Sequence, residues 1–217
     1  MASSAAPDSP SLSDQAYGLL EDQLVTLALP PGSMISEGQL IELTGLGRTP
    51  VREAMLRLAE QKLFRVLPRR GLLVTPLNRT DIQHVLEARK SLERVIVYRA
   101  ALNARDEQRS NISSIARAMS ITHDSFEDFL RLERELDDLL DACAGNPFAS
   151  SAVAPMRSHC RRLRYYFRRR VQLAETISVH SQMARLVARR DYTGAQKAVD
   201  GVIAVMERLA SSIERGT

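Results

Sequence analysis

Apolar residues recur at helical spacing along most of the chain, and one short region is β-prone instead. Spacing of three and four residues places apolar side chains on one face of a helix. The pattern breaks at Pro30-Pro31-Gly32, at Gly45 to Gly47 and at Gly145-Asn146-Pro147, which are typical helix stops. Helices are therefore predicted from about residue 11 to the first break, and over about residues 36–44, 50–61, 80–103, 106–120, 125–145, 151–172, 174–190 and 193–213.

These elements divide the chain into three parts. Residues 1–10 contain mainly Ala, Ser, Pro and Asp, and this composition predicts a disordered tail. Over residues 11–76, three short helices precede β-prone runs at 63–67 and 72–75, an order that predicts a winged helix-turn-helix. Residues 77–217 read as an all-α six-helix bundle, so the fold class is mostly α.

Several helix starts carry capping signals. Ser36 with Gln39, Thr80 with Gln83 and Thr193 with Gln196 each match a capping box. Thr49 is expected to cap the helix that follows the turn, with Pro50 at its first position.

The helix after the Gly-containing turn combines a buried face with exposed basic residues. Val51, Ala54, Met55 and Leu58 share the apolar face, and Arg48, Thr49 and Arg52 point elsewhere. Arg52 is expected to read a guanine edge, and Arg48 to bind a phosphate. The β-prone runs are joined by a turn with Arg70-Gly71, where an arginine can enter a minor groove. A core-packed helix with solvated charges is the alternative for either segment alone.

Charge and composition favour a polyanionic partner. The 217 residues carry a formal net charge of +4, yet residues 48–70 alone contain seven Arg or Lys against two Glu. That concentration of positive charge favours a polyanionic partner, and the turn and helix it surrounds make double-stranded DNA the expected one. Cys143 and Cys160 form no CxxC pair, and no apolar run is long enough for a membrane span. We therefore expect a cytoplasmic protein with reduced thiols and no membrane contact.

Charged residues also fall on apolar stripes of the predicted bundle. Arg89, Glu93, Glu133, Asp137 and His180 come from three different helices. A buried charge is costly unless it is paired, so such residues either pair or line a polar cavity. For any one of these residues, an ion pair, such as Arg89 with Glu93, is as good an interpretation as a polar cavity. For the set, we predict an effector-binding cavity with Arg89, Glu133, Asp137 and His180.

Two further groups of residues in the bundle carry predictions. The densest basic run is Arg161, Arg162, Arg164, Arg168, Arg169 and Arg170, interpreted mainly as a solvated helix face. His159 is expected to point inward, as a core histidine. The acidic residues of the cavity argue against a simple carboxylate effector unless Arg89 or a cation intervenes.

The first 76 residues resemble a known family. Pro31-Gly32, Ser36-Glu37, Gly45, the run Arg48 to Ala54 and Arg69-Arg70-Gly71 follow the order and spacing of GntR-family bacterial transcription regulators. The resemblance covers about residues 12–76 and implies DNA contacts at Arg48, Thr49, Arg52, Arg70 and Gly71. Gly47 stands where the family prefers Ser or Thr. Lys62 replaces a usual Gly, which predicts mild strain if its backbone is left-handed.

The bundle resembles the FCD-type ligand-binding domain of the FadR subfamily, in its shorter, VanR-like branch. That resemblance implies a metal site at positions held here by Glu133, Asp137, His180 and Val202. Val202 cannot ligate, and only one of three usual histidines is present. A divalent metal bound by Glu133, Asp137 and His180 is therefore an open alternative, with an oxygen-preferring ion favoured over zinc.

Together these features predict a homodimeric, sequence-specific transcription regulator, a repressor, controlled by a small-molecule effector and not an enzyme. The alternative is a metal-binding or enzymatic helical bundle with a winged-helix interaction module. An architectural winged helix without an effector is a third interpretation.

Overall fold

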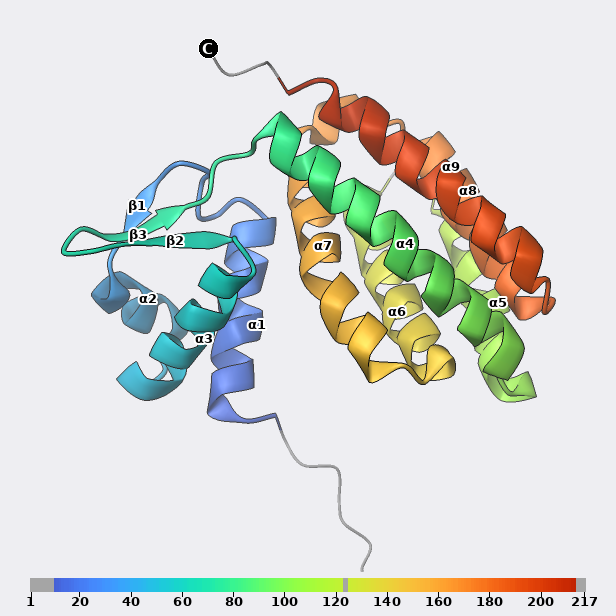
Figure 1. Cartoon of the computed structure of the whole chain (residues 1–217), viewed down its shortest axis with the longest axis horizontal. Helices are drawn as coiled ribbons and strands as arrows, with labels where there is room; N and C mark the ends of the chain where they lie inside the picture. The colour runs from blue at the N-terminus through green and yellow to red at the C-terminus, as the bar shows by residue number, and fades with distance from the viewer. Residues whose placement is uncertain (1–9, 123–124, 214–217) are drawn as a thin grey trace, which may run out of the picture. The chain divides into compact units, whose positions relative to one another are not determined.

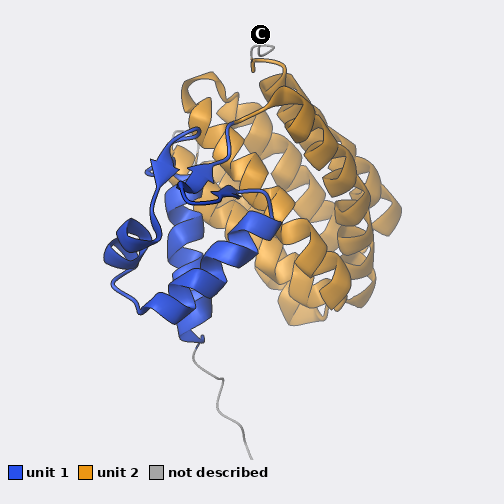
Figure 2. Ribbon diagram, turned by 60° about the vertical axis from the view of Figure 1, so that its left-hand side comes forward, with its two compact units in different colours: residues 1–76 blue, residues 77–217 orange. Residues whose placement is uncertain are grey.

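A computed structural model describes residues 10–122 and 125–213. The chain divides into two compact units, residues 1–76 and 77–217, coloured separately in Figure 2. This division lies at the predicted domain boundary. The tail predicted over residues 1–10 lies, apart from Pro10, outside the described residues, as does Asp124, one of two predicted starts for a helix of the bundle.

The first unit is a winged helix-turn-helix (Figure 1). Its elements, in chain order, are α1 (Leu12–Val25), β1 (Met34–Ile35), α2 (Glu37–Thr44), α3 (Arg48–Glu60), β2 (Phe64–Leu67) and β3 (Gly71–Val74). The strands form an antiparallel sheet in the order β1-β3-β2, with Phe64 opposite Val74 and Ile35 opposite Leu72. The two-residue strand β1 was not predicted, because a run this short has no periodicity of its own.

The first unit has its own hydrophobic core. Leu20 and Leu24 of α1, Leu40 of α2 and Leu58 of α3 are fully buried there. The helices therefore pack through the apolar faces that periodicity predicted, and α1 packs mainly against α3.

Two capping predictions in this unit have different outcomes. Ser36 and Gln39 form the predicted capping box at the start of α2, which ends at Gly45 in a left-handed conformation with φ 66°. The predicted Thr49 cap is wrong. The N-cap of α3 is Gly47, without a side-chain hydrogen bond, and Pro50 is the third helical residue. The helix begins two residues earlier than predicted, at Arg48, because Gly47 is extended and acts as its N-cap.

The second unit is a bundle of α-helices, as predicted. The described residues form α4 (Arg79–Asn103), α5 (Asp106–Ile121), α6 (Phe126–Ala144), α7 (Pro147–Tyr166), the 3₁₀ turn η1 (Arg168–Arg170), α8 (Leu173–Ala188) and α9 (Tyr192–Ala210). The long helix α4 packs against α6, α7 and α9, while α5 packs against α8 (Figure 1). None of the helices in the described residues is long and apolar enough to cross a membrane.

Several boundaries in this unit differ from prediction. α7 begins at Pro147 rather than near residue 151, because Asn146 accepts a hydrogen bond from the Ala149 N–H and Pro147 suits a first helical position. Asn78 and Asp191 cap α4 and α9, so the capping boxes predicted at Thr80 and Thr193 are wrong. Each cap lies two residues upstream, where an amide or carboxylate oxygen meets the first-turn N–H groups.

Candidate DNA-reading face and buried arginine network

Helix α3 presents a buried and an exposed face, as its periodicity predicted. Val51, Ala54, Met55 and Leu58 are buried in the core of the first unit. The exposed face carries Arg48, Thr49, Arg52, Glu53 and Leu56. Leu56 is 53% exposed, so the face also offers an apolar patch one turn beyond Arg52. A helix with this distribution can place side chains on base edges while its other face stays packed.

The start of α3 is open to an anion. Gly47 supplies no side-chain oxygen, so no side chain caps the backbone N–H groups of the first turn. Such groups, with the partial positive charge of a helix N-terminus, favour a phosphate. Because Gly47 has no side chain, these backbone N–H groups are open to direct contact with an anion.

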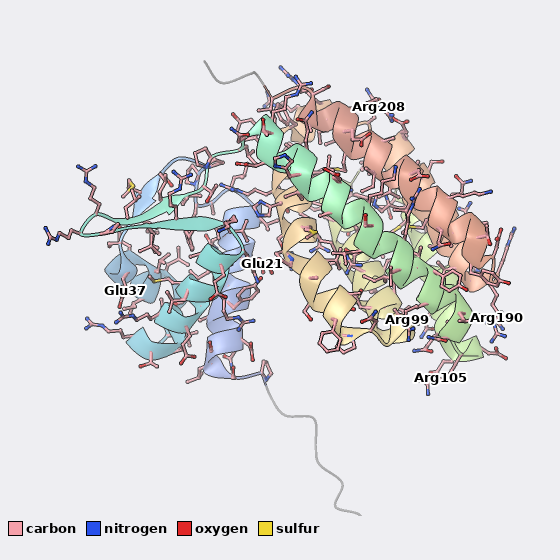
Figure 3. All side chains as sticks on the ribbon, in the orientation of Figure 1. Glu21, Glu37, Arg99, Arg105, Arg190 and Arg208 are labelled. Carbon is pink, nitrogen blue, oxygen red and sulfur yellow. The ribbon has the colours of Figure 1, made fainter. Side chains whose placement is uncertain are left out.

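The basic residues of this unit differ in what they contact. Arg57 donates to Asp14 Oδ1 over 2.8 Å and stacks over the Tyr17 ring at 4.4 Å, so it joins α3 to α1. Arg48 lies 3.7 Å from Glu37, labelled in Figure 3, but its side chain is 80% exposed. Such an exposed pair contributes little, so Arg48 remains available to a phosphate. Among the described residues, no ion pair is found for Arg52 or Arg70.

The turn of the wing depends on Gly71. Its φ is 99°, and a Cβ built on Gly71 would lie 2.8 Å from the Ile35 carbonyl oxygen. Glycine is therefore required by the close approach of β3 to β1, independently of any contact with DNA. Lys62, which stands in place of a usual Gly, has a left-handed φ of 64°, and Arg69 has the same φ. The preceding exposed Arg70 stands at the tip of the hairpin, where the sequence placed it.

The second unit contains a ladder of ion pairs between α6 and α7, buried at Glu133 and Asp137 and partly exposed at Asp141. Three carboxylates of α6, at Glu133, Asp137 and Asp141, face three arginines of α7. Arg164 contacts Glu133 at 2.5 Å, Arg161 contacts Asp137 at 2.6 Å, and Arg157 contacts Asp141 at 2.7 Å. The helices run in opposite directions, so residue numbers rise on one helix as they fall on the other. We call these residues, with Arg89, Glu93 and His180, the arginine network.

Helix α4 closes one end of the arginine network. Arg157 donates to both Glu93 carboxylate oxygens over 2.9 Å, and Arg89 donates to Glu93 over 3.1 Å. Arg89 and Glu93 thus form the i,i+4 ion pair that the sequence offers as the alternative to a polar cavity. Burial by itself would raise the pKa of Glu93, but Arg157 and Arg89 outweigh it and lower that pKa to about 2.

Helix α8 closes the other end through His180. Its Nδ1 donates to the Thr176 carbonyl oxygen over 2.7 Å, and its Nε2 lies 3.3 Å from Glu133. Burial opposes ionisation of Glu133, yet Arg164 and His180 hold its pKa well below the usual range. Burial raises the pKa of Asp137, in spite of Arg157 and Arg161.

The predicted inward residues Arg89, Glu93, Glu133, Asp137 and His180 are therefore all buried and brought together. The sequence interpretation missed the contribution of the α7 arginines to this cluster. Arg161, Arg162 and Arg164 are buried, contrary to the solvated face predicted for them, whereas Arg168, Arg169 and Arg170 are exposed. His159 is half-buried. A signal existed: arginines at i, i+4 and i+7 on one helix match carboxylates at i, i+4 and i+8 on the other.

The arginine network does not suit a divalent cation. Guanidinium groups contact Glu133 and Asp137 directly, and a metal ion would have to displace them. Val202 is a buried apolar residue. Within residues 10–122 and 125–213, no three His, Cys, Asp or Glu side chains are grouped to hold a metal ion. The residues present therefore do not fit the metal that the resemblance implies.

Comparison with known proteins identifies both units. The model of the bacterial regulatory proteins of the gntR family matches residues 12–74, and the FCD domain model matches residues 84–204. An HTH-type transcriptional regulator from the TAR-I ttuE-ttuC' intergenic region of Agrobacterium vitis is 36% identical over 87 residues. That match covers 40% of this chain and 51% of the relative, so it spans about half of that protein's length.

Two further matches extend over most of the chain. The HTH-type transcriptional repressor RspR of Escherichia coli strain K12 is 25% identical over 156 residues, covering 71% of this chain and 68% of the relative. The solved structure of Escherichia coli McbR/YncC superposes with a TM-score of 0.79 at 20% identity, covering 92% of this chain and 99% of the other. The second match shows the fold alone. The chain belongs to the GntR family of bacterial regulatory proteins, with an FCD domain as its second unit, and is a DNA-binding transcription regulator rather than an enzyme.

Proposed function

We propose that this protein is a homodimeric repressor of the FadR subfamily, in its VanR-like branch, that acts in the cytoplasm and releases its operator when an effector binds the FCD domain. The observation that carries the proposal is the exposed face of α3. It follows α2 through a tight turn, it is backed by a complete core, and Arg52 has no ion-pair partner among the described residues.

In this proposal the DNA contacts are those of α3 and the wing. Arg52 donates to a base edge in the major groove, and Thr49 and Arg48 contact phosphates beside the open start of α3. Arg70 enters the minor groove, while Gly71 lets the hairpin backbone approach the sugar-phosphate chain. A twofold dimer would present two such faces to half-sites about 10 bp apart.

The FCD domain supplies control. Arg89, Glu133, Asp137 and His180 act in this proposal as a rigid wall beside the effector, since their charges are already neutralised within the arginine network. Several buried polar atoms of the arginine network have no hydrogen-bond partner in the described residues, Arg89 Nη1 and Glu133 Oε2 among them. Unsatisfied buried groups are costly, so they favour water or a polar ligand close by.

The test is a binding selection from random duplex DNA with the full-length protein, followed by sedimentation of the protein alone and with the selected duplex. We expect a palindromic motif bound by two copies of the chain. Enrichment of no motif, or a motif bound by a single copy, would contradict the proposal. A screen of metabolites for a rise in melting temperature, followed by operator titrations with each hit, tests the effector, because a ligand of the native state stabilises it by mass action.

A further inference from the structure

Leu56 is an exposed leucine on the outward face of α3. Its exposed fraction is 53%, and it does not belong to the hydrophobic core of the first unit. Single exposed apolar residues are common on protein surfaces, so exposure alone assigns no role to it. Leu56 is distinguished by its position among the residues that the DNA-reading face contains.

Helical geometry places Leu56 near the middle of that face. An α-helix turns by about 100° per residue, so Leu56 lies about 20° from Thr49 and about 40° from Arg52 around the helix axis. The buried stripe of α3 lies on the opposite side of the helix. A helix docked in the major groove through Arg52 therefore directs Leu56 towards the base edges as well.

The charged residues around Leu56 also favour base edges over phosphates. Glu53 and Glu60 are exposed and lie three residues before and four residues after Leu56, on the same side of the helix. Carboxylates repel phosphates, whereas they can accept a hydrogen bond from the amino group of cytosine. This side of α3 is therefore suited to the floor of the groove, and contact with the sugar-phosphate chain is left to residues such as Arg48.

The chemistry of leucine selects one base from the four. A leucine side chain neither donates nor accepts hydrogen bonds, so it cannot satisfy the amino and carbonyl groups on the base edges. Thymine alone presents an apolar group in the major groove, its 5-methyl group. Packing this methyl group against Leu56 removes apolar surface of both from water, which stabilises the complex.

We propose that Leu56 is a specificity residue that packs against the 5-methyl group of one thymine in each half-site. Four residues of α-helix advance by about 6 Å, and successive base pairs by about 3.4 Å, so this thymine lies about two base pairs from the guanine read by Arg52. The inference rests on the proposed function, in which Arg52 reads a base edge, and adds a second base to that reading.

The experiment removes only the methyl group from the DNA. In the selected operator, each thymine in turn is replaced by deoxyuridine at the same place in both half-sites, which keeps the base pair and its hydrogen-bonding groups. Fluorescence anisotropy measures the affinity of the full-length protein at one salt concentration, because phosphate contacts make affinity salt-dependent. We expect one position, about two base pairs from the guanine, where the change weakens binding about fourfold for each half-site.

A matched pair of variants assigns the methyl contact to Leu56. Leu56→Ala should bind the thymine and deoxyuridine duplexes nearly equally, while Arg52 maintains the preference for guanine. Leu19→Ala is the control and should keep the full sensitivity, since Leu19 is 46% exposed on α1, which meets α3 through the core. Circular dichroism checks that both variants fold. Unchanged sensitivity to deoxyuridine in Leu56→Ala, or no sensitive thymine in the operator, would overturn the proposal.

These outcomes are separable from those that test the proposed repressor. If two copies bind a palindromic motif that has no position sensitive to deoxyuridine, the repressor stands and the Leu56 contact is wrong. If a sensitive position depends on Leu56 but a single copy binds, or no effector releases the DNA, the Leu56 contact stands and the dimer or its control fails. Enrichment of no motif overturns both.

Discussion

The two units use arginine in opposite environments. On α3 and the wing, Arg52 and Arg70 are exposed and have no ion-pair partner among the described residues. On α7, Arg161 and Arg164 are buried, and carboxylates of α6 contact them. An exposed guanidinium keeps its donors for a ligand such as DNA, whereas a buried one must satisfy them inside the protein. Arginine is thus free to bind a partner in one unit and organises a core in the other.

The largest effect is expected from breaking the arginine network. Glu133→Ala leaves Arg164 and His180 buried without their carboxylate, and losing one partner of a buried ion pair costs about 3–5 kcal/mol of unfolding free energy. Urea unfolding followed by circular dichroism measures this loss. Glu135→Ala is the control, since Glu135 lies on the same helix with 57% of its side chain exposed. A loss below about 1 kcal/mol would show that Glu133 is not coupled as the geometry indicates.

Acid should weaken the second unit through the same carboxylates. The pKa of Glu93 is lowered from its ordinary 4.5 to about 2, so the unfolded chain takes up the proton first as the pH falls. The stabilisation is present above about pH 5 and is lost towards pH 2, with a contribution on the order of 3 kcal/mol. The raised pKa of Asp137 acts in the opposite sense and reduces the net loss.

Unfolding free energies measured across this pH range provide the test, with Glu93→Gln as the variant. We expect a shallower pH dependence in the variant, because its amide does not titrate. Equal slopes for the two proteins would contradict the assignment of the loss to Glu93.

On the DNA-binding unit, Arg52→Ala should change specificity more than stability. A bidentate contact to a guanine contributes about 1–3 kcal/mol of discrimination against other bases. The variant should therefore bind duplexes with a base change at one position of each half-site almost as well as it binds the selected operator. Competition titrations with single-base variants of the operator measure this change. Base preferences identical to those of the unsubstituted protein would show that Arg52 makes no base-specific contact.

The smallest expected effect is that of Arg48→Ala. Loss of one phosphate contact weakens all sequences alike and lowers the slope of log affinity against log salt by about 1. Titrations at several salt concentrations, on the selected operator and on an unrelated duplex, give both quantities. A change confined to the selected operator would assign Arg48 a base contact instead. If neither Arg48→Ala nor Arg52→Ala altered binding, the proposed face would be wrong.

The fold of the first unit was largely predictable because its signals are local. The capping box at Ser36, the stop at Gly45 and the buried stripe of α3 each depend on residues within two turns of one another. Strand β1 was missed, since its two residues are extended only because β3 lies beside them. The role of Gly71 likewise became clear only from its approach to Ile35.

In the second unit, the positions of the helices followed from periodicity, but the burial and pairing of the charged residues did not. The sequence placed Arg89, Glu133, Asp137 and His180 on inward stripes, and for the set it predicted a cavity rather than the ion pairs that the structure shows. Arg161 and Arg164 find their carboxylates 24 and 31 residues away, on another helix. No window of sequence joins such partners, so the basic run was interpreted as solvated.

The sequence by itself therefore determined which segments are helical, which of their faces are apolar and which family the first 76 residues resemble. These properties follow from spacing, backbone preferences and caps along a continuous chain. Only the tertiary structure decided which arginines are exposed and free to bind a partner and which are held in buried ion pairs. Desolvation and pairing are set by neighbours in space, and those neighbours come from different helices of the bundle.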